Sequence, residues 1–320
     1  MKTSSGASCP FKLDWKHPFR VGRLRFRALS QKPERRLARR IAKLNLGAGP
    51  IAIERTEGGI SNHNFVVRVG GQDFVARLGE ERPLLGIDRR NEVVCHRAAS
   101  ALGLAPAVIH HEAGLLVTRF IAGRTLAQVD VRQPDCILLV ASQLRRLHDS
   151  WAGLIGEMVY FCPFQTVRTY AQTAAKIGAS LPNDIAQVLA DAAVLSRQIA
   201  PFRPVLCHND LLAANLINAD DRLWLVDWEY AGIGHACFDL ANLSANARFT
   251  DEQDRGLLTA YHGEFQPGHL TELRIFKAMS LVREALWSTI QTVASDIDFD
   301  YYRYAADNLE AYRAARSRLD

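Results

Sequence analysis

The hydrophobic pattern of the chain changes its period near residue 122, and this change is the strongest constraint on the fold. The stretches IAIERTE, NHNFVVRV and DFVARL have the alternation or the short apolar runs typical of strands, and glycine pairs separate them. GIDRRNEVVCHRAASALG then predicts a helix, and AVIHHEAGLLVTRFI predicts two more strands around a turn at Ala113–Gly114. Residues 50–121 are therefore expected to form a five-stranded sheet with one inserted helix.

After AGRTL the periodicity becomes helical, apart from a strand-rich insert at 205–231. The predicted helices are 134–149, 163–179, 184–200, 235–246, 251–264, 269–294 and 300–317. We therefore predict an α+β, two-lobed architecture, with a small β-rich lobe at 45–121, a linker near 118–125 and a larger α-rich lobe at 122–320. A cleft between two lobes is a preferred place for a ligand.

Charge is divided unevenly along the chain. The whole sequence has a net charge of +5, but residues 1–44 carry thirteen Lys and Arg against Asp14 and Glu34, a net charge of +11. The rest of the chain therefore has a net charge of −6. A mildly acidic body suits a cationic substrate or a divalent metal ion better than it suits nucleic acid.

The basic segment 1–44 admits three interpretations. It is a poorly ordered extension or the result of a start codon assigned too early, an Arg-rich targeting peptide, or an arm that contacts nucleic acid or anionic lipid. Residues 35–43 have a pattern that allows a short helix leading into the body. We expect no catalytic role for this segment.

The six cysteines are scattered, and no two of them have CxxC spacing. Neither a zinc site nor a disulfide framework is therefore expected, and the cysteines are predicted to be buried apolar side chains. The N-terminus lacks the apolar region of a secretory signal, and no apolar run reaches the length of a membrane span. These features predict a cytoplasmic protein, and none of them indicates an oligomeric state.

Polar side chains gather at strand ends in CHNDLLAANLINADDRLWLVDWE, residues 207–229. Asp210 and Asn215 are five residues apart in a loop, so both can face one point. Asp227 follows the apolar run LWLV, which would hold its carboxylate on a rigid element. An Asp and an Asn suit Mg²⁺, which takes few protein ligands and completes its shell with phosphate and water. With Asp210 free to accept a proton, these are the groups that phosphoryl transfer requires.

The same stretch resembles a known family. HNDLLAAN has the H-x-D-x-x-x-x-N spacing of protein-kinase catalytic loops, and VDWE stands where kinases have DFG. CHNDLLAANLI, LWLVDWEYAG and FDLAN are similar to the choline/ethanolamine kinase pattern, and so is the C-terminal LWSTIQTVASDIDFDYYRYAADNLEAY. The resemblance covers about residues 50–315. It implies the two-lobed, protein-kinase-like fold of the aminoglycoside phosphotransferase and choline kinase superfamily.

The resemblance also implies roles for the residues of this stretch. Asp210, Asn215 and Asp227 are the expected catalytic residues: Asp210 orients the acceptor hydroxyl and takes its proton, and the other two hold Mg²⁺. His208 is expected to hold the loop without reacting. Asp239, in FDLAN, is expected to anchor the catalytic loop through hydrogen bonds.

The small lobe matches the same family in its expected nucleotide site. GGISN supplies a glycine turn for the phosphates, without the GxxxxGK[ST] of a Walker-type loop. By resemblance, an arginine of the third strand grips phosphate, a helix glutamate pairs with it, and the backbone of LLVTRFIAG bonds the adenine. The expected nucleotide-binding residues are Gly58, Gly59, Ser61, Asn62, Arg77, Glu92 and Arg119.

Aromatic residues and carboxylates of the large lobe match the amine pocket of the family. A quaternary ammonium is best held by aromatic faces with carboxylates nearby. Glu284 stands where animal-type enzymes have a second Trp, which adds charge attraction but removes a ring face and so favours a primary ammonium such as ethanolamine, or a different amine. The expected substrate-binding residues are Asp210, Glu229, Tyr230, Glu284, Trp287 and Tyr304.

The predicted function is ATP- and Mg²⁺-dependent phosphorylation of the hydroxyl of a small amino alcohol, choline or ethanolamine. Alternatives are a kinase for thiamine, an aminoglycoside, a sugar or homoserine and, from other classes, a catalytically silent kinase-like binding protein or a nucleic-acid binder. The intact set of Asp210, Asn215 and Asp227 argues against a silent protein. The aromatic region of Trp287 and Tyr304 argues against an aminoglycoside pocket, which would have many carboxylates.

Overall fold

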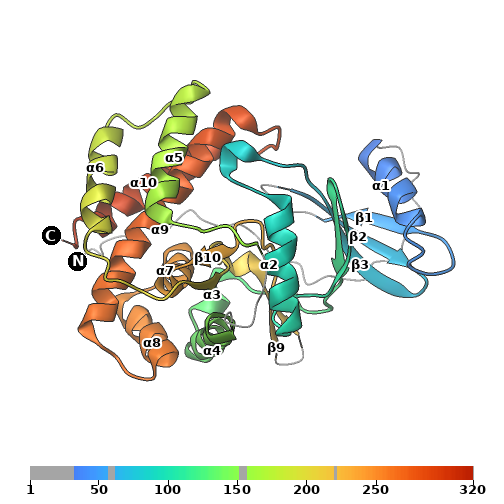
Figure 1. Ribbon diagram of the computed structural model, residues 1–320, viewed down its shortest axis with the longest axis horizontal. Helices are drawn as coiled ribbons and strands as arrows, with labels where there is room; N and C mark the ends of the chain where they lie inside the picture. Colours follow the sequence, from blue (N-terminus) through green and yellow to red (C-terminus); the bar gives the residue numbers. More distant parts are fainter. Residues whose placement is uncertain (1–31, 57–61, 151–156, 220–221, 320) are drawn as a thin grey trace, which may run out of the picture.

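The computed structural model describes residues 32–56, 62–150, 157–219 and 222–319. Figure 1 shows two lobes, a small one built on a twisted sheet and a larger helical one, with helix α2 (Arg89–Ala101) between them. The predicted α+β, two-lobed architecture is confirmed. The small lobe has the predicted five strands in the order β1-β2-β3-β5-β4, and all neighbouring pairs are antiparallel. Their bounds are β1 Ala52–Arg55, β2 His63–Val69, β3 Gln72–Leu78, β4 Val108–Glu112 and β5 Leu115–Arg119.

Glycines set the tightest turn of the small sheet. Gly70 and Gly71 join β2 to β3 and have φ angles of 60° and 73°, which the type I′ turn of a two-residue hairpin requires. The turn fixes the register of the hairpin, in which Asn64 pairs with Arg77 and Val69 with Gln72. Arg77, the cation of the expected nucleotide site, therefore lies near the end of β3, away from this turn.

Helix α1 (Lys32–Ala42) packs against the small sheet, although its residues belong to the segment predicted as an extension. Leu37 and Ile41, four residues apart on one helix face, are buried in a cluster with strand residues such as Phe65 and Phe74. Arg40 donates to the carboxylate of Glu112 at 2.6 Å. The helical part of the basic segment is thus packed on the small lobe, because its charges face outward while its apolar stripe covers the sheet.

Replacing Leu37 with alanine is expected to destabilise the protein by about 2–4 kcal/mol, since the side chain is fully buried between α1 and the sheet. Urea unfolding followed by circular dichroism would measure the change. Arg36→Ala, an exposed change on the same helix, is the control and is expected to have little effect. Equal stabilities for both variants would show that α1 contributes no packing energy.

The helices of the large lobe follow the prediction closely. α9 is the longest helix and packs against α10, α7 and α5, so it forms the centre of this lobe (Figure 1). The short α-helix α3 (Gln128–Val131) was not indicated by the periodicity. The predicted helices are α4 Pro134–Ser150, α5 Pro163–Lys176, α6 Ile185–Ser196, α7 Ala236–Ala247, α8 Asp251–His262, α9 Pro267–Ala294 and α10 Tyr301–Arg316.

The strand-rich insert, together with two strands outside it, β6 (Arg124–Thr125) and β10 (Gly232–Gly234), forms two small sheets beside α2. One sheet has the order β6-β8-β9 and the other pairs β7 with β10, all antiparallel. β8 and β9 form a hairpin that returns the chain from the loop after β7 to the segment that begins with Val226. The bounds are β6 Arg124–Thr125, β7 Val205–Cys207, β8 Leu216–Ala219, β9 Arg222–Leu225 and β10 Gly232–Gly234.

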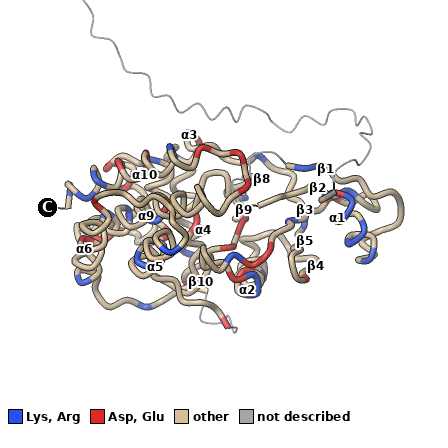
Figure 2. The backbone as a smooth tube through the Cα atoms, turned by 90° about the horizontal axis from the view of Figure 1, so that it is seen from above, with Lys and Arg blue, Asp and Glu red and all other residues tan. Residues whose placement is uncertain are grey.

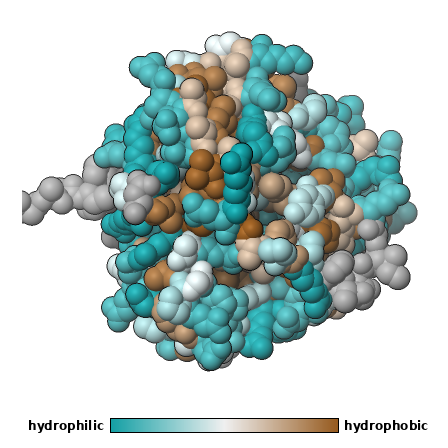
Figure 3. All heavy atoms as spheres, turned by 60° about the vertical axis from the view of Figure 1, so that its left-hand side comes forward, coloured by the Kyte–Doolittle hydropathy of each residue, from teal (hydrophilic) through white to brown (hydrophobic). Residues whose placement is uncertain are grey.

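Charged residues of both signs are spread along the described backbone, and Lys and Arg residues gather on α1 (Figure 2). On the face seen in Figure 3, hydrophobic side chains lie in separate patches with hydrophilic ones between them. Among the residues that the structure describes, no helix combines the length and apolar character that crossing a membrane requires. The five described cysteines are free. Cys95, Cys207 and Cys237 are buried, as predicted, whereas Cys136 and Cys162 are only half-buried.

Candidate active site

The loop after β7 is held in place by the start of helix α7. The backbone N–H groups of His208 and Asn209 donate to the two carboxylate oxygens of Asp239, at 2.8 and 2.7 Å. Asn209 has a φ of 62°, and these bonds help to keep it in this left-handed conformation. His208 donates through Nε2 to the carbonyl of Val226 at 3.0 Å. The expected anchoring role of Asp239 and the structural role of His208 are therefore confirmed by the contacts.

The loop brings Asp210 and Asn215 together, as the spacing predicted. Asn215 Nδ2 donates to the backbone carbonyl of Asp210 at 2.9 Å, which leaves its side-chain oxygen as the atom that can face a ligand. Asn242 of α7 accepts a hydrogen bond from the backbone N–H of Leu211 and donates to Ser280 of α9 at 2.9 Å. The loop is thus bonded to α7, and through Asn242 to α9.

Asp227 lies next to Asn215 because the two segments are joined by backbone. The N–H of Val226 donates to the carbonyl of Asn215 at 3.0 Å. Asp227 has a φ of 65°, a left-handed conformation that Asp and Asn tolerate better than most residues. Its side chain is 25% exposed, against 12% for that of Asp210. The three predicted catalytic residues therefore converge on one place.

Arg77 connects the small lobe to this place. Its guanidinium pairs with Glu92 of α2, as the sequence predicted, and Nη1 also donates to Asp227 Oδ1 at 3.1 Å. Burial alone would lower the pKa of Arg77, but Glu92, Asp227 and Glu229 together raise it above the usual range. Burial likewise would raise the pKa of Glu92, and Arg77 and Arg89 instead hold it below its usual value. Both groups are charged at neutral pH.

Glu229 is not in the amine pocket, contrary to the prediction. Its Oε2 accepts from Arg89 Nη1 at 2.9 Å and from Asn62 Nδ2 at 2.8 Å, and the residue is 2% exposed. Asn62, which was predicted to bind nucleotide, therefore lies in a cluster with Arg89 and Glu229. The prediction was wrong for Glu229 because its side chain, in the turn after β9, contacts Arg89 of α2, whereas Tyr230, the next residue, bonds Trp287 of α9.

The other expected parts of the nucleotide site are Arg119 and the glycine turn. Arg119 is exposed at the end of β5, where it bonds Gln72 at 2.9 Å and covers the ring of Phe74, so its side chain is directed to β3 and not to a ligand. Its assignment as a nucleotide-binding side chain is therefore not supported. Gly58, Gly59 and Ser61 lie outside the described residues.

Aromatic side chains from three segments form a wall beside Asp210. Trp287 Nε1 donates to the hydroxyl of Tyr230 at 2.8 Å, and the Trp287 and Tyr304 rings are in edge contact at 6.3 Å between centroids. The hydroxyl of Tyr304 donates to Glu284 Oε2 at 3.1 Å. The four predicted pocket residues Tyr230, Glu284, Trp287 and Tyr304 thus lie together.

Arg283 is a residue of this wall that the sequence reasoning missed. It is 1% exposed, its guanidinium lies 4.5 Å from the centre of the Tyr230 ring, and Nη1 is 2.8 Å from Glu284 Oε1 and 3.4 Å from Asp210 Oδ1. Both oxygens of Glu284 therefore have partners, so its charge attracts an ammonium less than was predicted. An arginine inside the apolar run KAMSLVREALWSTI was the signal that could have indicated a buried, paired cation.

Asp210 and Asp227, the two aspartates predicted to be catalytic, lie close to other acidic side chains. Burial raises the pKa of Asp210 to about 7, with Arg283 opposing the shift and Glu284 adding to it. Burial and Glu229 raise the pKa of Asp227 well above its usual value, although Arg77 opposes this. The site therefore has more negative charge than its arginines balance, and a divalent cation would relieve the excess.

The residues fit a magnesium ion by their chemistry. Asp227 and Asn215 offer hard oxygen atoms, which Mg²⁺ prefers, and few protein ligands are needed when phosphate oxygens complete the shell. His148, Cys207 and Asp239 also lie close together within the described residues. Asp239 is already bonded to the loop and His148 to Tyr261, so this buried cluster is structural.

A buried histidine of α2 is expected to make the protein acid-sensitive. Burial lowers the pKa of His96 to about 4, although the carbonyl of Pro106, 2.9 Å from Nε2, opposes the shift. Between about pH 6.5 and 4 the unfolded chain binds a proton that the folded chain does not, so stability falls as pH falls. From pH 7 to 5, the wild type is expected to lose about 2 kcal/mol more than His96→Gln in urea unfolding. Equal losses would contradict this.

The comparisons with known proteins agree with this geometry. Residues 52–276, more than half of the chain, match the family model described as the phosphotransferase enzyme family, APH. The chain belongs to this family. Its members are kinase-type phosphotransferases, so the predicted enzyme class is confirmed.

Similar proteins include one named protein LicA, an ethanolamine kinase and a member of the choline/ethanolamine kinase family. Protein LicA of Haemophilus influenzae is 27% identical over 267 residues, which are 79% of this chain and 97% of LicA. Human ethanolamine kinase 2 is 28% identical over 274 residues, 75% of this chain and 69% of that protein. A crystal structure of a choline/ethanolamine kinase family protein from Mesorhizobium loti has a TM-score of 0.72 at 29% identity, covering 87% and 94% of the two chains. The predicted resemblance to this family is confirmed.

Proposed function

We propose that this phosphotransferase transfers the γ-phosphoryl group of ATP to the hydroxyl group of choline or ethanolamine. The observation that carries the proposal is a juxtaposition: Asp210, with Asn215 and Asp227 beside it, adjoins the aromatic wall through Arg283. An acceptor hydroxyl can therefore meet the catalytic loop while its ammonium rests against rings. The choline and ethanolamine kinase names of the relatives support the same substrates.

Each charged residue has a task in the proposed reaction. Asp210 orients the hydroxyl and accepts its proton, which its raised pKa favours at neutral pH. Arg77, aligned by Glu92, neutralises phosphate charge. Asn215 and Asp227 would hold Mg²⁺, which when bound neutralises charge on the β- and γ-phosphates.

The ammonium is proposed to lie against Trp287 and Tyr304. Cations are attracted to the faces of aromatic rings, and most strongly to Trp. Arg283 already covers Tyr230, so this ring has less surface for a second cation. Asp210 and the Glu284–Arg283 pair together leave one negative charge in excess, which suits a substrate of charge +1.

A coupled assay of ADP release tests the substrate. Choline, ethanolamine, thiamine and an aminoglycoside are each offered with ATP and Mg²⁺, and turnover is expected to be highest with choline or ethanolamine. Turnover with thiamine or the aminoglycoside alone would favour the alternative small-molecule kinases. No ADP release with any acceptor would favour a silent binding protein. A cytoplasmic location stays a prediction, consistent with the free thiols of the described cysteines.

A further inference from the structure

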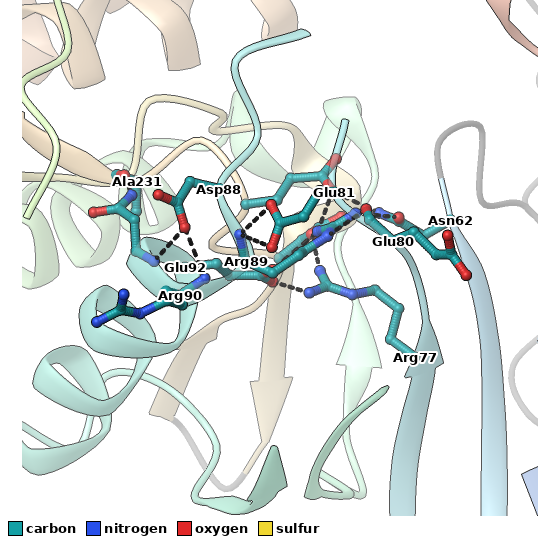
Figure 4. A network of polar contacts seen from close by, with 12 residues as sticks. Asn62, Arg77, Glu80, Glu81, Asp88, Arg89, Arg90, Glu92 and Ala231 are labelled. Atoms are coloured by element: carbon teal, nitrogen blue, oxygen red, sulfur yellow. Dashed lines mark hydrogen bonds and ion pairs between the residues drawn. The ribbon is translucent and has the colours of Figure 1, made fainter. Parts of the chain in front are cut away.

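Arg89, at the first position of α2, is a buried cation that the proposed reaction does not use directly. The residue is 6% exposed, and its side chain contacts Asn62, Glu80 and Glu92 of the small lobe (Figure 4). It also contacts Glu229 of the large lobe. We propose that Arg89 is a positioning residue that fixes the small lobe over the nucleotide by joining Asn62 to Glu229. The inference rests on the proposed use of ATP.

The guanidinium of Arg89 is shared between three side chains. Nη1 donates to Glu92 Oε2 and to Glu229 Oε2, both at 2.9 Å, and Nη2 donates to Asn62 Oδ1 at 3.0 Å. The remaining nitrogen, Nε, donates to the carbonyl of Glu80 at 3.1 Å. Asn62 closes the ring through its own bond to Glu229 at 2.8 Å. Every nitrogen of the guanidinium is therefore bonded, so the side chain has one well-defined position.

Burying these charged side chains has an unfavourable free energy unless each charge is paired. Glu92 and Glu229 are almost fully buried, and removing a charge from water is unfavourable without an opposite charge and hydrogen bonds. A simple pair within α2 would need only Glu92, which is three residues from Arg89. The additional bond to Glu229 comes from 140 residues further along the chain and belongs to the large lobe. The contact therefore ties the two lobes together.

Glu92 connects the Arg89–Glu229 contact to Asp227, which is proposed to be catalytic. One of its oxygens pairs with Arg77, which itself bonds Asp227, and the other pairs with Arg89, which bonds Glu229. Two bridges between the lobes thus meet at one carboxylate, and on the large-lobe side they end two residues apart. A pair of bridges fixes both the distance and the tilt of the small lobe relative to Asp227, whereas one bridge would act as a hinge.

Asn62 connects the same tie to the expected phosphate turn, since it directly follows the GGIS stretch. Gly79 confirms how tightly this place is packed: a Cβ there would lie 3.0 Å from Arg89 Nη2 and 3.2 Å from Asn62 Oδ1. The added methyl group of Gly79→Ala would therefore crowd the atoms of the Arg89–Asn62 hydrogen bond, while every charged group stays in place. This variant gives a second way to disturb the tie.

The experiment compares Arg89→Met, Arg89→Lys and Gly79→Ala with the wild type, using ATP, Mg²⁺ and the better of choline and ethanolamine. Arg90→Met, an exposed change at the next position of α2, is the matched control. Arg89→Met is expected to raise KM for ATP and to lower kcat, each by about tenfold or more, because the phosphates and Asp227 are no longer aligned. KM for the amine is expected to stay within about twofold, since the amine residues lie in the large lobe.

Arg89→Lys is expected to recover part of the loss, because one ammonium can satisfy some of the acceptors but not the fork of the guanidinium. Gly79→Ala is expected to shift KM for ATP in the same direction as Arg89→Met. Calorimetry with Mg²⁺ and a non-hydrolysable ATP analogue gives a readout that needs no turnover, at a temperature where each variant is folded.

The outcomes separate this inference from the proposed function. The inference is overturned if the folded variants keep KM for ATP within about twofold of the wild type, or if KM for ATP and for the amine rise together. If Arg89→Met does not fold, Arg89→Lys and Gly79→Ala decide by the same criteria. A wild type that neither binds the analogue nor phosphorylates an amine refutes the proposed function instead.

Discussion

Replacing Asp210 with alanine is expected to lower kcat by about three to four orders of magnitude, because the acceptor hydroxyl loses the group that orients it and takes its proton. Asp210→Asn keeps the shape and separates the loss of the base from a loss of packing. Steady-state rates of both variants, with Mg²⁺–ATP and the amine at saturation, measure the effect. Near-normal rates in either variant would contradict the role given to Asp210.

Nucleotide binding is the control for this experiment. Asp210 contacts Arg283 and the loop rather than Arg77, so affinity for a non-hydrolysable ATP analogue is expected to change little. The alternative of a silent binding protein makes the opposite prediction for turnover, since the wild type and Asp210→Ala would then be equally inactive. Turnover thus tests the proposed chemical role of Asp210, and binding of the analogue tests whether the variant keeps its nucleotide site.

Replacing Asp227 is expected to have a similarly large effect through magnesium. Both Asp227→Ala and Asp227→Asn lose a carboxylate proposed as a metal ligand, so turnover should fall by several orders of magnitude and respond weakly to added Mg²⁺. A magnesium titration at fixed ATP measures this. Magnesium dependence identical to that of the wild type would refute the assignment.

The two Asp227 variants are expected to differ in stability. The left-handed φ of 65° suits Asn but is unfavourable for Ala by about 1–2 kcal/mol. Because the folded protein raises the pKa of Asp227, its charged form is disfavoured there, so a neutral side chain is stabilising above the usual pKa of an Asp. Without metal, Asp227→Asn should therefore unfold at no lower temperature than the wild type, and Asp227→Ala should unfold below Asp227→Asn.

The sequence predicted those parts of the molecule whose signals are local. Glycine pairs and alternation indicated the small sheet, and the spacing of Asp210, Asn215 and Asp227 indicated the loop and strand that bring them together. The pairing of Arg77 with Glu92 also followed, but from a family resemblance and not from periodicity. The strand and helix periods of the sequence predict on which face of an element a side chain lies. This prediction depends only on residues a few positions away.

Contacts between distant charged residues were harder to predict. Arg89 meets Glu229 across 140 positions and Arg283 meets Asp210 across 73, and no periodic pattern relates such pairs. Glu229 was therefore assigned to the amine pocket by its place in the motif, although its side chain turns to Arg89. Arg119 was assigned to the nucleotide site by its place in LLVTRFIAG, the segment expected to bond the adenine. Its side chain instead contacts Gln72 and the ring of Phe74.

The anchoring of the catalytic loop has a consequence for the order in which substrates bind. Asp239 and Asn242 of α7 hold the loop, and Asn242 and Arg283 join it to α9, the helix that also carries Trp287. The proposed base and the proposed amine wall therefore both belong to the large lobe, and Arg77, proposed to grip phosphate, belongs to the small lobe. In the proposed reaction, the residues that receive the acceptor are therefore held together within the large lobe, independently of the contacts that the small lobe makes with the nucleotide. We therefore expect the amine to bind in the absence of nucleotide, so that the proposed reaction requires no fixed order of substrate binding.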